Sequence, residues 1–111
     1  AEGSVFFEAA DAFRDWGIAT TDAILNVREV DDEIELIASG GLKNGVDVAK
    51  SIALGASMGG FAREILAPAM ESVEALSTKI DVMIYQLKVA MFMSGVDDVD
   101  GLKNLELKKV K

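Results

Sequence analysis

Residues 38–63 read ASGGLKNGVDVAKSIALGASMGGFAR, and this stretch decides the fold. It starts at the end of a short apolar run, Ile34–Ala38, which is predicted to be a buried strand because it leads into paired glycines. Val46–Leu54 follows with the apolar spacing of a helix, and Gly55 is placed to end it. Ala56–Phe61 is then predicted to be a second short strand rich in small residues. The order strand, helix, strand predicts two parallel strands joined by a helix.

Helices are predicted on both sides of this central unit. In chain order they are Val5–Phe13, Thr20–Arg28, a helical turn at Ala62–Ala67 that ends at Pro68, Ser72–Met93 and Val99–Asn104. Within the long helix, we interpret Met83, Met91, Phe92 and Met93 as core or subunit-contact surface. Two strands are too few for a stable sheet, and a complete β/α barrel takes about 250 residues. The predicted fold class is therefore α/β, and the chain of 111 residues looks like one part of a larger fold.

The composition excludes several classes of function. The formal net charge of −8 disfavours sequence-independent binding to nucleic acid, because such binding needs a positive surface. Cysteine and histidine are both absent, so neither thiolate nor histidine catalysis can come from this chain. No apolar run reaches the roughly 18 residues that a membrane span needs, and no signal peptide is recognisable at the start. We therefore expect a soluble cytoplasmic protein that binds neither nucleic acid nor membrane.

Two glycine-rich loops follow the predicted strands. Ser39–Gly45 joins the first strand to the central helix, and Gly59–Arg63 follows the second strand. Backbone amides at such corners lack partners within the helix, and glycines let the backbone approach an anion closely. Lys43 and Arg63 each add a positive charge. Because consecutive βα units place their loops side by side at the carboxyl end of a barrel, the pair of loops predicts a phosphate site.

A plainer interpretation of these residues stays open. Paired glycines after a strand are commonly only a turn, and Lys43 or Arg63 alone is most often a solvated charge. On this interpretation the chain is a non-enzymatic, helix-rich interaction module that binds no phosphate-bearing ligand. Trp16, which precedes Gly17, is interpreted as a packing residue, with a wall of an active-site mouth as the alternative.

The same loops resemble those of FMN-dependent barrel enzymes. Ala38–Ala56 is similar to the FMN-phosphate motif of that superfamily, whose branches include the α-hydroxy-acid oxidases and the type 2 isopentenyl-diphosphate isomerases. Phe13–Thr20, FRDWGIAT, is similar to an isomerase segment that carries proline where Ala19 stands. Leu87–Gly95, LKVAMFMSG, is similar to the terminal-helix motif of the isomerases. The oxidases place a catalytic histidine before the paired glycines, and the corresponding stretch Glu8–Ala12 contains none.

The resemblance implies a fold and a binding site. Residues 1–111 are expected to be the C-terminal segment of a single FMN-binding TIM (β/α)8 barrel domain, with its last two strands, their helices and a long terminal helix. The residues expected to hold the FMN phosphate are Gly41, Leu42 and Lys43 in the first loop, and Ala62 and Arg63 in the second. Lys43 stands where arginine is common, which keeps the charge but loses the bidentate geometry. The family often lacks a basic residue at the position of Arg63, so its backbone is the expected contact.

The resemblance also implies an activity for the complete barrel. That activity is the FMN- and Mg²⁺-dependent interconversion of isopentenyl and dimethylallyl diphosphate in isoprenoid biosynthesis, with NADPH as the flavin reductant and a homo-oligomeric assembly. No catalytic or metal-binding residue of the family matches a motif in this chain. Those residues are expected in the rest of the barrel, and the segment alone is expected to be inactive. The alternative is another FMN-dependent barrel oxidoreductase of the α-hydroxy-acid oxidase type.

Overall fold

The structure, a computed structural model, describes residues 5–13, 15 and 17–105. Its elements in chain order are α1 (Val5–Asp11), α2 (Thr20–Val30), β1 (Ile37–Ala38), α3 (Gly45–Leu54), β2 (Met58–Gly59), α4 (Arg63–Glu71), α5 (Val73–Met93) and α6 (Val99–Lys103). β1 and β2 pair in parallel, and α3 connects them. The predicted pair of parallel strands joined by a helix is therefore confirmed, although each strand is shorter than the sequence pattern suggested.

The core lies on one face of the strand pair. Ile37 is opposite Met58, and Ala38 is opposite Gly59. Because successive side chains of a strand point to opposite faces, Ala38 is buried whereas Ile37 and Met58 are 59% and 50% exposed. The residues buried with Ala38 come from α2, α3, α6 and the loops: Ile24, Leu42, Val48, Ala49, Ile52, Ala56 and Leu102. The prediction of buried strands is thus wrong for one of their two faces, since helices cover only the other.

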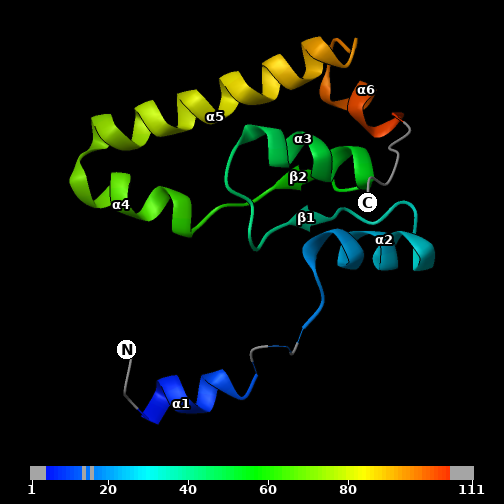
Figure 1. Cartoon of the computed structure of the whole chain (residues 1–111). Coiled ribbons are helices and arrows are strands. Elements are labelled where there is room, and N and C mark those ends of the chain that lie inside the picture. The colour runs from blue at the N-terminus through cyan, green and yellow to red at the C-terminus, as the bar shows by residue number, and fades with distance from the viewer. Residues whose placement is uncertain (1–4, 14, 16, 106–111) are drawn as a thin grey trace.

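The long helix α5 packs across α3 (Figure 1). Gly45, the first residue of α3, leaves no room for a side chain at this crossing. A Cβ there would collide with the carbonyl oxygen of Met83 and would lie 2.6 Å from the amide nitrogen of Leu87. The amide of Gly45 donates to Oε1 of Gln86 at 2.9 Å. The close approach therefore joins the start of α3 directly to the middle of α5.

The end of α4 differs from the sequence-based prediction. Pro68 lies inside α4, which continues to Glu71. Proline removes one internal hydrogen bond, but the last turn of α4 still packs against α5, which Ser72 begins as its N-cap. In α5, Met83 is buried and Met91 packs against the core, as predicted. Phe92 and Met93 are 83% and 80% exposed, so for these two subunit contact stays a prediction. No helix in the described part of the chain is both long and apolar enough to cross a membrane.

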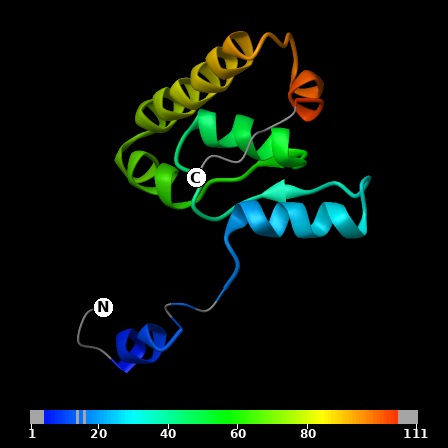
Figure 2. The ribbon, with the colours of Figure 1, turned by 45° about the vertical axis from the view of Figure 1, so that its right-hand side comes forward.

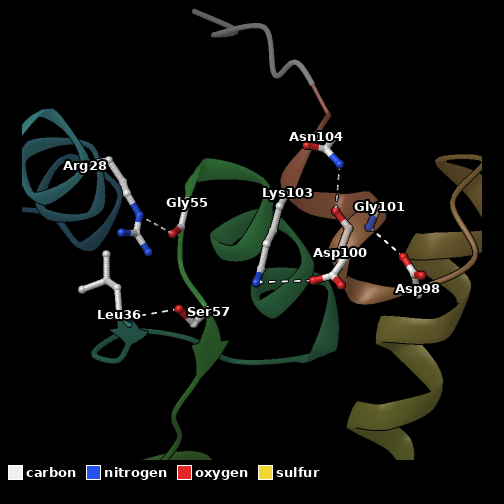
Figure 3. Close-up of polar contacts among 9 residues, drawn as sticks. All are labelled: Arg28, Leu36, Gly55, Ser57, Asp98, Asp100, Gly101, Lys103 and Asn104. Carbon is white, nitrogen blue, oxygen red and sulfur yellow. Dashed lines mark hydrogen bonds and ion pairs between the residues drawn. The ribbon is translucent and has the colours of Figure 1, made fainter. Parts of the chain in front are cut away.

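Side-chain hydrogen bonds hold the elements together at the amino ends of the strands (Figure 3). Nε of Arg28, in α2, donates to the carbonyl oxygen of Gly55 at 2.7 Å. The amide of Leu36, just before β1, donates to Oγ of Ser57, just before β2, at 3.0 Å. These bonds fix α2 and both strands relative to one another, and so they also position the carboxyl ends of the strands.

Helix α1 lies apart from the other elements in both views (Figure 1, Figure 2). None of its residues is buried. Trp16, for which the sequence suggested a packing role or a place at an active-site mouth, lies outside the described residues, as does Arg14 of the same motif.

Candidate functional site

A pocket lies at the carboxyl ends of the two strands. Its volume is about 350 Å³, and two segments line it: residues 39–43 after β1 and residues 60–64 after β2. The five residues that the sequence predicts as a phosphate site all line this pocket: Gly41, Leu42, Lys43, Ala62 and Arg63. The structure therefore brings the predicted residues together around one cavity.

Parallel pairing explains why two loops that are separate in sequence meet here. Ala38 pairs with Gly59, and the amide of Gly60 donates to the carbonyl oxygen of Ala38 at 2.7 Å. Because the strands run in the same direction, both segments leave the sheet at the same end, directly after this bond. The loops thus start side by side and share one cavity.

The first loop turns through two glycines in the left-handed region. The φ angle is +94° at Gly40 and +79° at Gly41, values that residues with a Cβ rarely adopt. A Cβ placed on Gly41 would meet no atom within 4 Å, so the backbone there is open to an incoming group. Oγ1 of Thr20 donates to the carbonyl oxygen of Gly40 at 2.7 Å. Within the described residues, the amides of Gly41 and Leu42 have no protein acceptor.

The second loop leads into the uncapped start of α4. The N-cap residue is Ala62, whose side chain makes no capping hydrogen bond. Among the residues that the structure describes, the amides of Ala62 and Arg63 also have no acceptor. Unpartnered amides and the positive end of the helix dipole both favour a negatively charged group at this position.

The start of α3, by contrast, is already occupied by protein groups. Oδ1 of Asn44 accepts the amide hydrogen of Asp47 at 2.9 Å, and Gln86 accepts that of Gly45. Oδ2 of Asp47 accepts the amide hydrogen of Lys43 at 2.8 Å. Three amides at this corner, those of Lys43, Gly45 and Asp47, therefore already have protein acceptors and are not available to an anion. The anion site predicted for this loop thus depends on the amides of Gly41 and Leu42, and it stays a prediction.

Two cations and one acid border the pocket. Lys43 and Arg63 are exposed and form no ion pair within the described part of the chain, while Glu64 is partly buried. The sum is one positive charge, which attracts an anion weakly because water and salt screen it. Leu42 is 8% exposed and packs in the core, so its backbone is the part available to a ligand. No acidic cluster among the residues 5–13, 15 and 17–105 is arranged to hold a metal ion.

Sequence patterns did not identify the side chains that hold the loops in place. Asn44 followed three residues later by Asp47 is a pattern of helix starts, so these two could have been recognised. For Thr20, the sequence pattern predicts only a role as a helix cap. Its hydrogen bond to the carbonyl oxygen of Gly40 connects residues that are 20 positions apart. Gln86 is a lone polar residue in an apolar helix, and its partner lies 41 positions away. Such long-range bonds leave no local signal in the sequence.

Known proteins match this chain over most of its length. A family model described as FMN-dependent dehydrogenase matches residues 14–109. A protein named isopentenyl-diphosphate delta-isomerase from Stutzerimonas stutzeri is 46% identical over 98 residues, which is 88% of this chain and 28% of that protein. Proteins of the same name from Sulfurisphaera tokodaii and Pseudescherichia vulneris are 46% and 42% identical, over 86% and 92% of this chain. The chain spans 26% to 29% of the length of these three relatives.

Proposed function

This chain belongs to the family of FMN-dependent dehydrogenases, and on that premise we propose that it binds the phosphate group of FMN. The pocket shared by residues 39–43 and 60–64 is the observation that carries the proposal. The amides of Gly41 and Ala62 have no acceptor within the described part of the chain, and they would supply the donors that a phosphate dianion requires. Two basic side chains at the rim add positive charge.

For the complete protein, we propose the activity that the name of its relatives describes, the isomerisation of isopentenyl diphosphate, here to dimethylallyl diphosphate. Bound FMN, once reduced, would supply the proton-transfer chemistry that moves the double bond. Mg²⁺, NADPH as the flavin reductant, a cytoplasmic location and a homo-oligomeric state belong to the same proposal. The catalytic and metal-binding residues would lie in the part of the relatives that this chain does not cover.

The bare face of the strand pair supports a larger barrel. Ile37 and Met58 project from that face and are about half exposed. Beside β2, an apolar groove of about 440 Å³ is bordered by residues of α3, α4 and α5. In a (β/α)8 barrel, inward-pointing side chains from the strands pack together in layers, and the helices form an outer ring. The remaining strands and helices of such a barrel would cover both the face and the groove.

A hybrid protein tests the phosphate site. In this barrel hybrid, the present chain replaces the matching region of the Stutzerimonas stutzeri relative, which supplies the other strands. We expect the purified hybrid to show flavin absorbance and to bind FMN more tightly than riboflavin, because riboflavin lacks the phosphate. Equal affinity for the two flavins would reject the phosphate site.

The same hybrid separates the candidate activities. With reduced FMN and Mg²⁺ it should isomerise isopentenyl diphosphate, and the unaltered relative is the control for the assay. Oxidation of hydroxy acids without isomerisation would instead assign the chain to the oxidase branch. A folded hybrid that binds no flavin would support the non-enzymatic interaction module.

A further inference from the structure

We infer that Asp47 is a positioning residue that holds the loop 40–43 in the conformation that receives the phosphate. The inference rests on the proposed function and extends it to a residue that does not line the pocket. The carboxylate of Asp47 accepts the amide hydrogen of Lys43 at 2.8 Å, and its own amide donates to Asn44 at 2.9 Å. These two hydrogen bonds, one to Lys43 and one to the N-cap residue Asn44, fix the junction between the loop and α3.

The loop separates two hollows. The phosphate pocket of about 350 Å³ and a smaller hollow of about 160 Å³ are both lined by Gly40, Gly41 and Leu42. Asp47 and Thr20 line the smaller hollow and not the pocket. The carboxylate of Asp47 thus reaches the loop from behind, with the loop backbone between it and a bound anion. Water and salt screen the repulsion between the two charges, and we expect the hydrogen bond to Lys43 to outweigh it.

The two back-side contacts act on opposite ends of the loop. Asp47 accepts the amide hydrogen of Lys43, a residue that itself lines the pocket. Thr20 holds the carbonyl oxygen of Gly40 at 2.7 Å. With both ends fixed before the ligand arrives, binding the phosphate orders less of the chain and so loses less conformational entropy.

Asp47→Ala in the barrel hybrid tests this role. FMN affinity should fall about tenfold, which is in the range expected for loss of one hydrogen bond to a charged group. Riboflavin affinity should stay unchanged, since that flavin has no phosphate to be positioned. Asp47→Asn keeps an oxygen acceptor in the same place and should restore most of the FMN affinity. Quenching of flavin fluorescence measures all of these affinities.

Asp98→Ala is the matched control. The carboxylate of Asp98 also accepts a backbone amide hydrogen: its Oδ1 accepts that of Gly101 at 2.8 Å, as the N-cap of α6. Its loss should lower the melting temperature and leave the ratio of FMN to riboflavin affinity unchanged. If Asp47→Ala leaves FMN affinity intact, or weakens both flavins alike, Asp47 has no positioning role.

Two further results complete the test. A hybrid without substitutions that fails to prefer FMN over riboflavin rejects the proposed function, and the role of Asp47 falls with it. If Asp47→Ala does not fold, Asp47→Glu keeps the charge and displaces the acceptor. This variant should show the same selective loss of FMN affinity, and normal FMN binding by it would overturn the inference.

Discussion

Gly41 and Gly95 have similar φ angles but lie in different parts of the structure. Their φ angles are +79° and +75°, and a Cβ on either would meet no atom within 4 Å. Gly41 lines the pocket, whereas Gly95 follows the end of α5. Replacing either glycine by alanine should cost a similar folding free energy, about 1 kcal/mol. The pair therefore separates backbone strain from an effect on ligand binding.

We predict that Gly41→Ala weakens FMN binding to the barrel hybrid by about tenfold, which corresponds to about 1.4 kcal/mol. The added methyl group would take up open space beside an amide that is proposed to contact the phosphate. Gly95→Ala should lower the melting temperature by about as much as Gly41→Ala does, but it should leave FMN affinity unchanged. Flavin titration and thermal denaturation of both variants measure this. The same FMN affinity in both would contradict the proposed contact.

Asp31 offers a prediction about pH. Its carboxylate accepts the amide hydrogens of Glu33 at 2.8 Å and Ile34 at 3.1 Å. These two hydrogen bonds, with a smaller contribution from Arg28, outweigh desolvation and lower the pKa of Asp31 below its ordinary value of 3.8. Because the folded pKa is the lower one, the stabilisation is complete above the ordinary value and is lost as the pH falls through the folded pKa.

An NMR titration of the Asp31 carboxyl group tests this prediction directly, with a midpoint expected below pH 3.8. Asp31→Asn should remove the corresponding part of the acid dependence of stability. A midpoint at or above the ordinary value would show that the turn after α2 is not held by these bonds.

At the scale of elements, the contact between α3 and α5 depends on the absence of a side chain at Gly45. We predict that Gly45→Ala destabilises the barrel hybrid by about 3 kcal/mol, because the methyl group would meet the backbone of α5 and not a flexible side chain. Urea denaturation measures the loss. Gly60→Ala is the control, since its Cβ would find ordinary contacts at 3.6 Å. Equal stability of the two variants would show that α5 does not dock through Gly45.

Local patterns predicted the elements well and their partners poorly. The helix expected at Val46–Leu54 is observed within one residue, because apolar spacing and Gly55 are both local signals. Pro68 is predicted to end a helix, yet α4, which packs against α5, continues through it to Glu71. Some of the amides expected to be free between β1 and α3 are occupied, that of Gly45 by Gln86 from a distant helix. Propensity acts locally, whereas these outcomes depend on which elements meet.

At the scale of the whole molecule, the five predicted pocket residues were found together because two parallel strands place their loops side by side. The exposure of Ile37 and Met58 could not be predicted in the same way. Their apolar character points to burial, but none of the described residues buries them. The family itself was recognised from three segments that resemble known motifs, and not from periodicity or composition.

The proposed barrel predicts an effect that is not expected for the isolated chain. Ile37→Asp should change the stability of this chain alone by about 0.5 kcal/mol or less, because the side chain is 59% exposed. In the barrel hybrid the same change should be strongly destabilising, because it would bury a charge in the barrel interior. Val73→Asp, at an 80% exposed position at the start of α5, is the control and should be mild in both. Equal effects of Ile37→Asp in the two proteins would argue against a closed barrel.

The hydrogen bond from the amide of Gly60 to the carbonyl oxygen of Ala38 is the last link between the strands before the pocket. Any motion that spreads the two loops apart strains this link before others in the sheet. The exchange rate of the Gly60 amide proton with solvent therefore reports how often this hydrogen bond opens, and with it the two loops that line the pocket. NMR can measure this rate in the absence of flavin. Slower exchange after flavin is added would indicate that the bound flavin holds the two loops together.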